Sequence, residues 1–96
     1  MNFKWDLKKA KANEQKHKIT FLEACYVFAD KCLLTLLDEE HSSKEERWIT
    51  IGQSDSGKIL VVVHTYRKAK GTETIRIISA RKATKNEEKQ YCERRG

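Results

Sequence analysis

An apolar run near the C-terminus, residues 75–80, contains one arginine and leads directly into two further cations. Arg76 lies inside the run, and Arg81 and Lys82 follow it just before the helix-capping residue Thr84. A charged side chain is costly to bury among isoleucines unless it is paired or reaches solvent. We therefore predict that this stretch is the last strand of a small sheet, and that it holds cationic side chains toward a phosphate-bearing partner.

The composition is typical of a small protein with an anionic partner. The chain has 96 residues, with 20 Lys and Arg against 14 Asp and Glu, a formal net charge of +6 and a pI of about 9.3. This balance favours nucleic acid as the partner first, an acidic protein second and a membrane surface third. No apolar run is long enough to span a membrane and no linker divides the chain, so we expect a single domain over residues 1–96.

Cysteine and histidine usage argues against a metal centre and against a disulfide framework. Cys25, Cys32 and Cys92 form no CxxC pair, and the histidines are scattered, with none at ligand spacing from a cysteine. An odd number of cysteines, in a sequence that lacks the pattern of a signal peptide, is typical of reduced thiols. We expect a cytoplasmic protein that carries no metal and no other cofactor.

A first helix is predicted over residues 6–17. Asp6 can cap it, and its inner stripe would run from Leu7 and Ala10 to Asn13 and His17. Polar residues on an inner stripe need hydrogen-bond partners. We therefore expect Asn13 and His17 to be satisfied by such partners in the core.

A second helix is predicted to begin after Thr20. Thr20 and Glu23 have the spacing of a capping box, in which each side chain accepts a hydrogen bond from the other residue's backbone amide. Apolar residues from Phe21 to Phe28 then recur at helical spacing and form one face. This face is expected to pack in the core.

The rest of the chain has the pattern of strands joined by tight turns. Residues 59–63 are all Ile, Leu or Val, which is typical of a central strand buried on both faces. Strands grouped in hairpins, with the helices segregated, predict an α+β fold in which an antiparallel sheet carries two N-terminal helices and one C-terminal helix. The predicted elements are a strand at 3–5, helices at 6–17 and 20–30, strands at 32–37, 47–53 and 58–67, turns at 54–57 and 68–73, a strand from 74, and a helix from 85 to 95.

The predicted C-terminal helix lacks an apolar face. Thr84 and Glu87 form a second capping box, but between residues 85 and 95 only Tyr91 and Cys92 are at all apolar. Helices are normally stabilised by an apolar face that packs on the core. Burial alone therefore cannot fix this helix, and it must fray, dock loosely or be held by a partner or substrate.

Three arginines on neighbouring strands are the candidate anion-binding residues. Arg67 ends the central strand, and Arg76 and Arg81 belong to the last one, while His64 and Tyr66 share one face of the central strand. Side chains on adjacent antiparallel strands can meet, so such a cluster could grip a phosphate bidentately. Arg76 and Arg81 are five residues apart, however, and would point to opposite faces of an unbroken strand. Either the strand ends near residue 79, or only one of the two belongs to the site.

Short motifs are spread along nearly the whole chain. Together they resemble the BrnT toxins of bacterial type II toxin–antitoxin systems, although no single motif is specific. In chain order they are Phe3-x-Trp5-Asp6, Lys9-Ala10-x-x-Asn13-x-x-Lys16-His17, Phe21-x-Glu23-Ala24, Phe28-x-Asp30, Asp38-x-x-His41, Arg47-x-x-x-Ile51-Gly52, Val62-Val63-x-Thr65 and Ile75-Arg76-Ile77-Ile78-Ser79-Ala80-Arg81-x-Ala83, followed by Glu88 and Tyr91.

The resemblance implies a RelE-like fold and a ribonuclease activity that inhibits translation. It also implies neutralisation by a cognate antitoxin, BrnA, whose DNA-binding part lets the pair repress its own operon. The protein itself would meet DNA only indirectly, through that antitoxin. These expectations agree with a small basic α+β protein that carries cations on a sheet.

The resulting hypothesis is an RNA endonuclease that needs no metal. The 2′-hydroxyl of the RNA attacks the adjacent phosphate and leaves a cyclic phosphate and a 5′-hydroxyl. Arg67, Arg76 and Arg81 would hold and neutralise that phosphate. The remaining candidates are Lys82 as a further phosphate contact, His64 or Tyr91 for proton transfer, and Glu87 or Glu88 as alternatives for proton transfer.

Two other functions stay open at this point. The same basic face could belong to a module that binds nucleic acid without any chemistry. ParE toxins share the RelE-like fold and act on DNA gyrase, so the fold alone does not exclude a protein target.

Overall fold

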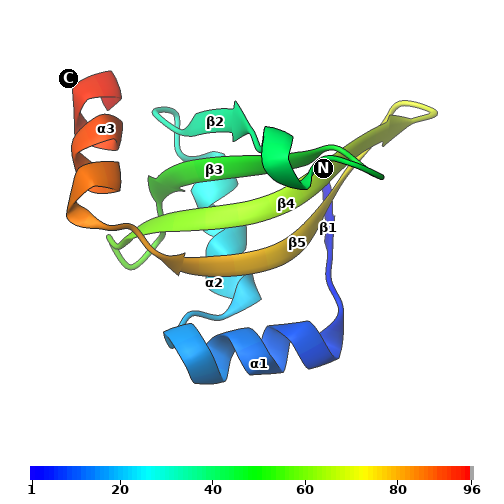
Figure 1. Cartoon of the computed structure of the whole chain (residues 1–96), viewed down its shortest axis with the longest axis horizontal. Coiled ribbons are helices and arrows are strands. Elements are labelled where there is room, and N and C mark those ends of the chain that lie inside the picture. The colour runs from blue at the N-terminus through cyan, green and yellow to red at the C-terminus, as the bar shows by residue number, and fades with distance from the viewer. Residues whose placement is uncertain (96) are drawn as a thin grey trace.

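The structure is a computed structural model that describes residues 1–95. Within these residues the structure has one sheet of five strands (Figure 1). The helices α2 and η1 cover one face of this sheet, and α1 lies along one of its edges. The last helix, α3, lies at one end of the other face. The elements are β1 (Asn2–Lys4), α1 (Leu7–His17), α2 (Phe21–Cys25), the 3₁₀ helix η1 (Tyr26–Ala29), β2 (Leu34–Leu37), the 3₁₀ helix η2 (Glu39–His41), β3 (Arg47–Gln53), β4 (Ile59–Ala69), β5 (Thr72–Lys82) and α3 (Lys85–Arg95).

The sheet is mixed rather than antiparallel. Its strand order is β1-β5-β4-β3-β2, and β2 to β5 pair antiparallel as predicted. β1 instead runs parallel to β5, with Phe3 opposite Ile75. Only antiparallel neighbours can be joined by a tight turn. β1 and β5 are separated by most of the chain, so no hairpin dictates their relative direction, and the prediction was wrong at this edge.

Turn chemistry sets the lengths of the strands. Gly57 has φ of 86° in the predicted turn at 54–57. Between β4 and β5 the turn is only Lys70 and Gly71, both at positive φ, of 52° and 79°. Positive φ at both central residues matches the right-handed twist of a two-residue hairpin. The predicted loop at 68–73 is therefore too long, and both strands extend into it.

The helix caps agree with the sequence in most respects. Asp6 accepts hydrogen bonds from the amides of Lys8 and Lys9 at 2.8 and 3.1 Å. Thr20 accepts one from the amide of Glu23 at 3.0 Å. The carboxylate of Glu23 does not complete the predicted box, because it accepts hydrogen bonds from hydroxyls in the turn at 54–57 instead.

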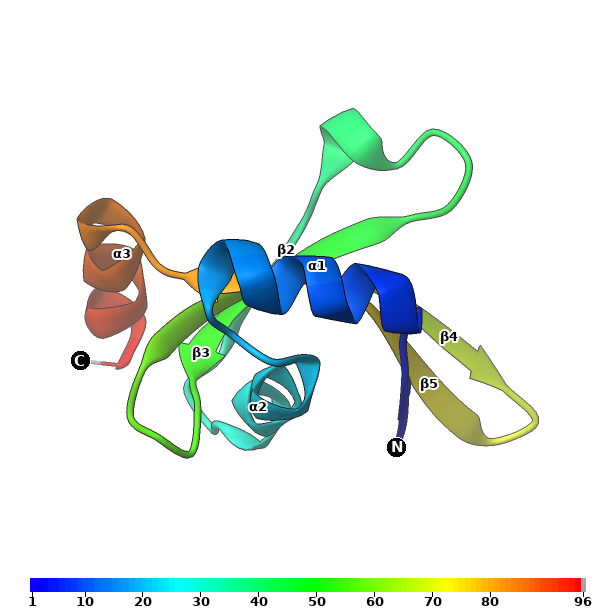
Figure 2. The ribbon, with the colours of Figure 1, turned by 90° about the horizontal axis from the view of Figure 1, so that it is seen from below.

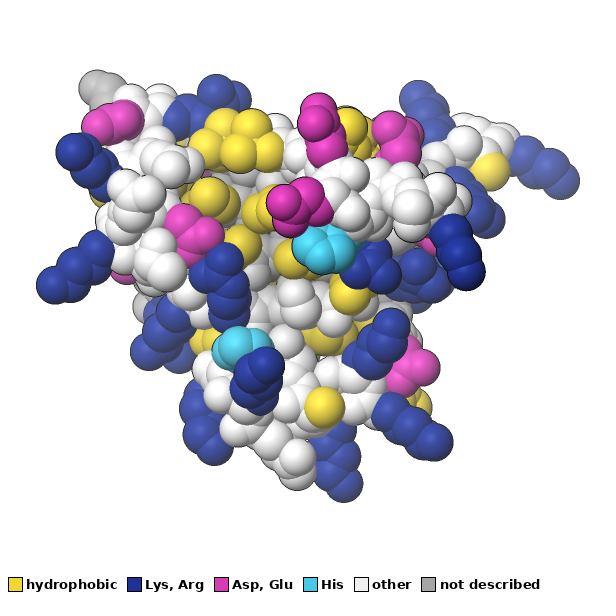
Figure 3. All heavy atoms as spheres, in the orientation of Figure 1, with side chains coloured by type: hydrophobic (Ala, Val, Ile, Leu, Met, Phe, Trp, Pro, Cys, Tyr) yellow, Lys and Arg dark blue, Asp and Glu magenta, His cyan; other side chains and the backbone are white. Residues whose placement is uncertain are grey.

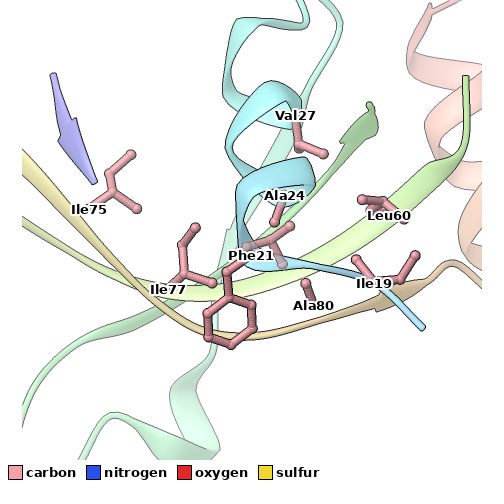
Figure 4. Packing of buried hydrophobic residues seen from close by; sticks show 9 residues of the cluster. Ile19, Phe21, Ala24, Val27, Leu60, Ile75, Ile77 and Ala80 are labelled. Carbon is pink, nitrogen blue, oxygen red and sulfur yellow. The ribbon is translucent and has the colours of Figure 1, made fainter. Parts of the chain in front are cut away.

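The main core lies between the sheet and the second helical segment. In Figure 4 Phe21, Ala24 and Val27 point from α2 and η1 toward the apolar side chains of β4 and β5. Gly52 allows the close approach of η1 to β3, since a Cβ at this position would lie 2.8 Å from Cγ1 of Val27. The residues of this cluster are Ile19, Phe21, Ala24, Val27, Leu60, Val62, Ile75, Ile77 and Ala80.

The first helix packs along the edge of β5 that β1 leaves open. The predicted inner stripe of α1 is wrong at Leu7, which is 80% exposed, because Trp5 contacts Phe21 and covers the core at this point instead. Asn13 is buried as predicted, whereas His17 at the end of the predicted stripe is only partly buried. Its amide donates to the carbonyl oxygens of Ile19 and Ala80 at 3.1 and 2.8 Å and accepts from the amide of Ala80 at 3.0 Å.

Asn13 thus replaces a missing neighbouring strand. β1 pairs with β5 only from Thr74 to Arg76, so the outward backbone groups of Ala80 have no strand beside them. Unpaired backbone groups at a sheet edge must be covered or satisfied when they are buried. One side-chain amide, held on α1, supplies both hydrogen bonds.

Four contacts, one apolar and three polar, hold α3 against the sheet. They explain how a helix without an apolar face is fixed in place. Tyr91 is 1% exposed and packs on Ile51 and Val61, and its hydroxyl donates to the carboxylate of Asp30. Two arginine contacts complete the set: Nε of Arg94 donates to the carbonyl oxygen of Leu33 at 2.9 Å, and Arg81 pairs with Glu87. Tyr91 is therefore the centre of a small second core, whose other members are Ile51 and Val61 with Cys32, Leu34, Ile49, Ile59 and Ala83 packed against them.

Replacing Asn13 with alanine should lower the free energy of unfolding by about 2–4 kcal/mol, because it leaves buried backbone groups of Ala80 and Ile19 without partners. Urea unfolding followed by circular dichroism measures this. Gln15→Ala, an exposed change on the same helix, is the matched control and should cost less than about 0.5 kcal/mol. Equal losses in the two variants would contradict the assigned role of Asn13.

Candidate active site

The sheet face that lies opposite α2 is called the open face. Along β4, Leu60 and Val62 pack in the main core beneath α2. Val61, Thr65 and Arg67 alternate with them and therefore lie on the open face. Figure 2 shows the 38–46 connection between β2 and β3 rising on this side of the sheet, opposite α2.

A β-bulge in β5 brings Arg76 and Arg81 to the open face together. The pairing of β5 with β4 shifts by one residue at Ile78, so that Arg76 stands opposite Thr65 and Arg81 opposite Val61. A bulge adds one residue to one strand and reverses the alternation of faces beyond it. The strand therefore continues to Lys82, so the predicted early end near residue 79 is wrong.

The open face carries a polar pocket of about 290 Å³ near β1. Three cationic side chains, two threonines and one carboxylate line it, from the ends of β1, β4 and β5 and from the 38–46 connection. In Figure 3 this face shows yellow apolar side chains across its middle, with dark-blue Lys and Arg side chains around them on both sides and along the lower edge. The lining residues are Lys4, Glu45, Thr65, Arg67, Thr74 and Arg76.

The pocket has an excess of positive charge. Arg76 makes one contact with Glu45, at 3.3 Å from Nη2 to Oε2, and both side chains are 46% exposed. An exposed pair of this kind contributes little to stability and is easily exchanged for another anion. Among residues 1–95, Arg67 has no carboxylate within ion-pair distance. Two guanidinium groups, one ammonium group and two hydroxyls can thus converge on one bound anion.

Arg81 lies on the same face but at the other end, beside α3. Its Nη1 and Nη2 donate to the two carboxylate oxygens of Glu87 at 2.7 and 2.9 Å. Glu87 also completes the predicted capping box, since the amide of Thr84 donates to it at 2.9 Å and its own amide donates to the Thr84 hydroxyl at 3.2 Å. The Arg81 guanidinium, together with the amide of Thr84, lowers the pKa of Glu87 to about 2.

His64 and Lys82 lie on the other side of the sheet. His64 is 4% exposed, contacts Phe28 edge-on at 4.9 Å between ring centroids, and shares a 2.7 Å hydrogen bond with the hydroxyl of Thr50. Burial lowers the pKa of His64. Lys82 pairs with Leu60, whose side chain is in the main core, so it shares the α2 face. The structure thus separates both residues from the three arginines.

Comparison with known proteins identifies the family. A family model described as the ribonuclease toxin BrnT of type II toxin–antitoxin systems matches residues 5–87. The chain belongs to this family. The crystal structure of the Brucella abortus ribonuclease toxin BrnT is similar, with a TM-score of 0.60 and 23% identity over 88% of this chain and 99% of that one. At this identity the likeness shows the fold alone. No curated protein matches the chain.

The family predicted from the motifs is confirmed, and a type II system implies an antitoxin as partner. Across the described residues of this BrnT-family chain, no helix is long and apolar enough to cross a membrane. In the same part of the chain no group of three His, Cys, Asp or Glu side chains is arranged to hold a metal ion.

The sequence reasoning missed four residues of the pocket in this toxin. Lys4 did leave a signal, because it alternates with Phe3 and Trp5 and must point away from their apolar face. Thr65 and Thr74 gave none, since hydroxyls are common in strands. Glu45 lies in a stretch that was interpreted as a solvated acidic connection, and only the path of the chain brings it to Arg76.

The proton-transfer candidates lie outside the pocket. His64 is on the α2 face, and Tyr91 is buried beneath α3, with its hydroxyl on Asp30. Glu87 is bound to Arg81, and Glu88 is exposed on α3. The roles assigned to these residues stay predictions, but the geometry keeps all four away from Arg67 and Arg76.

The ion pair between Arg81 and Glu87 should make this toxin sensitive to acid. The folded-state pKa of Glu87, about 2, is below its ordinary value of 4.5, so its contribution is complete above pH 4.5 and is lost as the pH falls toward 2. In urea unfolding between pH 7 and pH 2.5, Glu87→Gln should be less stable at pH 7 and lose less stability over this window than wild type. Glu88→Gln is the matched control. A wild-type pH dependence in Glu87→Gln would refute the assignment.

His64 is expected to serve packing rather than cleavage. His64→Ala removes a buried ring that fills space between Phe28 and Thr50, so the free energy of unfolding should fall by about 2–4 kcal/mol. Under conditions where the variant is fully folded, as judged by circular dichroism, its rate of RNA cleavage should stay close to wild type. If folded His64→Ala cleaves RNA more than about tenfold more slowly than wild type, His64 takes part in catalysis.

Proposed function

We propose that this chain is a metal-independent endoribonuclease whose pocket on the open face holds the scissile phosphate of single-stranded RNA. The observation that carries the proposal is the convergence of Lys4, Arg67 and Arg76 on one polar pocket with two threonine hydroxyls. Guanidinium groups bind phosphate bidentately, and an ammonium group binds it as a point charge. These cations can take the role that a metal ion has in other nucleases, which is to neutralise charge on the phosphate.

The reaction is an attack by the RNA's own 2′-hydroxyl. The 2′-oxygen forms a bond to phosphorus as the bond to the 5′-oxygen breaks, which leaves a 2′,3′-cyclic phosphate and a 5′-hydroxyl. Charge that develops on the non-bridging oxygens is stabilised by Arg67 and Arg76, which the rigid β4–β5 hairpin holds in place. DNA lacks the 2′-hydroxyl and is not a substrate.

Arg81 extends the path of the RNA across the open face. Along β4 the partners of Arg76 and Arg81 are four residues apart, a separation of about 13 Å at the rise of a strand. The strand of RNA can therefore contact the pocket with one phosphate and reach toward Arg81 with another. Arg81 also holds α3 through Glu87, so an RNA phosphate would compete with that carboxylate.

We further propose that the activity inhibits translation in the cytoplasm and that a BrnA-like antitoxin neutralises it. An acidic or amphipathic segment of the antitoxin would cover the open face, which masks the cations and stabilises the toxin. Contact with DNA would then be indirect, through the antitoxin.

Arg67→Ala and Arg76→Ala should each slow cleavage of a single-stranded RNA by about 10²–10³-fold, the usual cost of removing a preorganised donor to developing negative charge. Lys68→Ala is the matched control, because Lys68 is exposed beside Arg67 but alternates to the other face. Rates come from gel-resolved cleavage at fixed protein excess. A control that loses as much activity as the two arginine variants would contradict the pocket assignment.

The same assay tests the metal and the nucleophile. Wild-type cleavage should continue in EDTA, should yield 2′,3′-cyclic phosphate and 5′-hydroxyl ends, and should leave DNA of the same sequence intact. Loss of cleavage in EDTA would overturn metal independence. If the chain is toxic in cells but the purified protein leaves RNA intact, a non-catalytic nucleic-acid-binding role or a protein target would be favoured instead.

A further inference from the structure

We propose that Glu45 is the base that takes the proton from the attacking 2′-hydroxyl. This inference rests on the proposed function and assigns a role that sequence reasoning left open. Glu45 is the one carboxylate among the residues that line the pocket in the described part of the chain. It lies on a different element from the cations, so it can face a phosphate that they hold.

The position of Glu45 follows from how the 38–46 connection is held. The amide of Asp38 donates to the carbonyl oxygen of Arg47 at 2.8 Å, which closes the base of the connection. The amide of Arg47 also donates to the hydroxyl of Ser42 at 3.1 Å. With its base closed, the connection rises over the open face (Figure 2) and brings Glu45 to within 3.3 Å of Arg76.

Elimination supports the same assignment. A general base must lie within hydrogen-bond reach of the proton that it removes. His64 lies on the α2 face, and the side chain of Tyr91 is buried between α3 and the sheet. Glu87 is held by Arg81 at the far end of the open face, and Glu88 is exposed on α3. Glu45 alone among the candidates combines a carboxylate with a place beside Arg67 and Arg76.

The contact with Arg76 suits this role chemically. Positive groups face Glu45 from three elements, namely Lys4 on β1, Arg67 on β4 and Arg76 on β5. An ionised carboxylate is the form that accepts a proton. When a phosphate takes over Arg76, the carboxylate is released beside the 2′-hydroxyl of the preceding nucleotide.

The step balances without a further reactant. The bond between hydrogen and the 2′-oxygen breaks, and its proton moves to the carboxylate of Glu45. The 2′-oxygen forms the new bond to phosphorus, and the bond from phosphorus to the 5′-oxygen breaks. The 5′-oxygen takes a proton from water in this solvent-open pocket, and Glu45 returns its own proton to water.

In an alternative role, Glu45 would be only a counter-ion to Arg76 that blocks the pocket. The two roles predict opposite effects of Glu45→Gln on rate. Removing a blocking charge would speed cleavage or leave it unchanged, whereas removing the base slows it by about 10²-fold or more. Glu46→Gln, an exposed change of equal charge at the next position, is the matched control.

The decisive experiment measures single-turnover cleavage and RNA binding separately. Glu45→Gln should cleave the RNA that wild type cuts at least about 10²-fold more slowly. It should bind the analogue with a 2′-deoxy residue at the cut site at least as tightly as wild type does, by fluorescence anisotropy. The acidic limb of the wild-type pH–rate profile should be lost in Glu45→Gln and kept in Glu46→Gln.

An RNA substrate with sulfur in place of the 5′-bridging oxygen distinguishes two roles of Glu45, as general base toward the 2′-hydroxyl or as general acid toward the leaving group. Sulfur leaves without being protonated, so a defect in Glu45→Gln that persists on this substrate supports the base, and a defect that disappears overturns it. Wild-type rates in Glu45→Gln overturn this inference alone, as long as wild type still produces cyclic phosphate ends. If wild type does not cleave RNA, the proposed function has failed and not merely the role of Glu45.

Discussion

The single extra residue in β5 is the constraint on which the candidate site depends. Strand side chains alternate with a period of two, so each residue's face follows from its neighbours. The bulge at Ile78 breaks that alternation once, between Arg76 and Arg81. Before it, Ile75 and Ile77 face the main core, and beyond it Ala80 does. The strand keeps its apolar side on α2 along its whole length while both arginines stay on the open face.

The open face is bounded by two structures that polar contacts hold in place. At one end α3 is fixed by Tyr91, by Arg94 and by the pair of Arg81 with Glu87. At the other end the 38–46 connection brings Glu45 to the cationic pocket. Charged groups therefore serve both as structure and as candidate chemistry on one surface. At each end one arginine is paired with a carboxylate, Arg76 with Glu45 and Arg81 with Glu87.

Membership of the BrnT family was evident from motifs, and so was much of the fold. The helix from 85 to 95, the strand at 47–53 and the turn at 54–57 were predicted with their observed limits, because caps, alternation and turn residues act locally. The antiparallel sheet was wrong at β1, whose partner is distant in sequence. Asn13 was correctly expected to be satisfied, but its partner on β5 is 67 residues away.

The sequence by itself determined most of the local elements and the basic charge, since each of these depends on neighbouring residues or on composition. Only the tertiary structure decided which groups share a face. It placed Arg67, Arg76 and Arg81 on one face, with Arg81 at the far end of that face. It also placed His64 in the core and brought Lys4 and Glu45 to the pocket from distant segments. The physical reason is that register, bulges and loop paths are set by packing of the whole chain, and a shift of one residue exchanges the two faces of a strand.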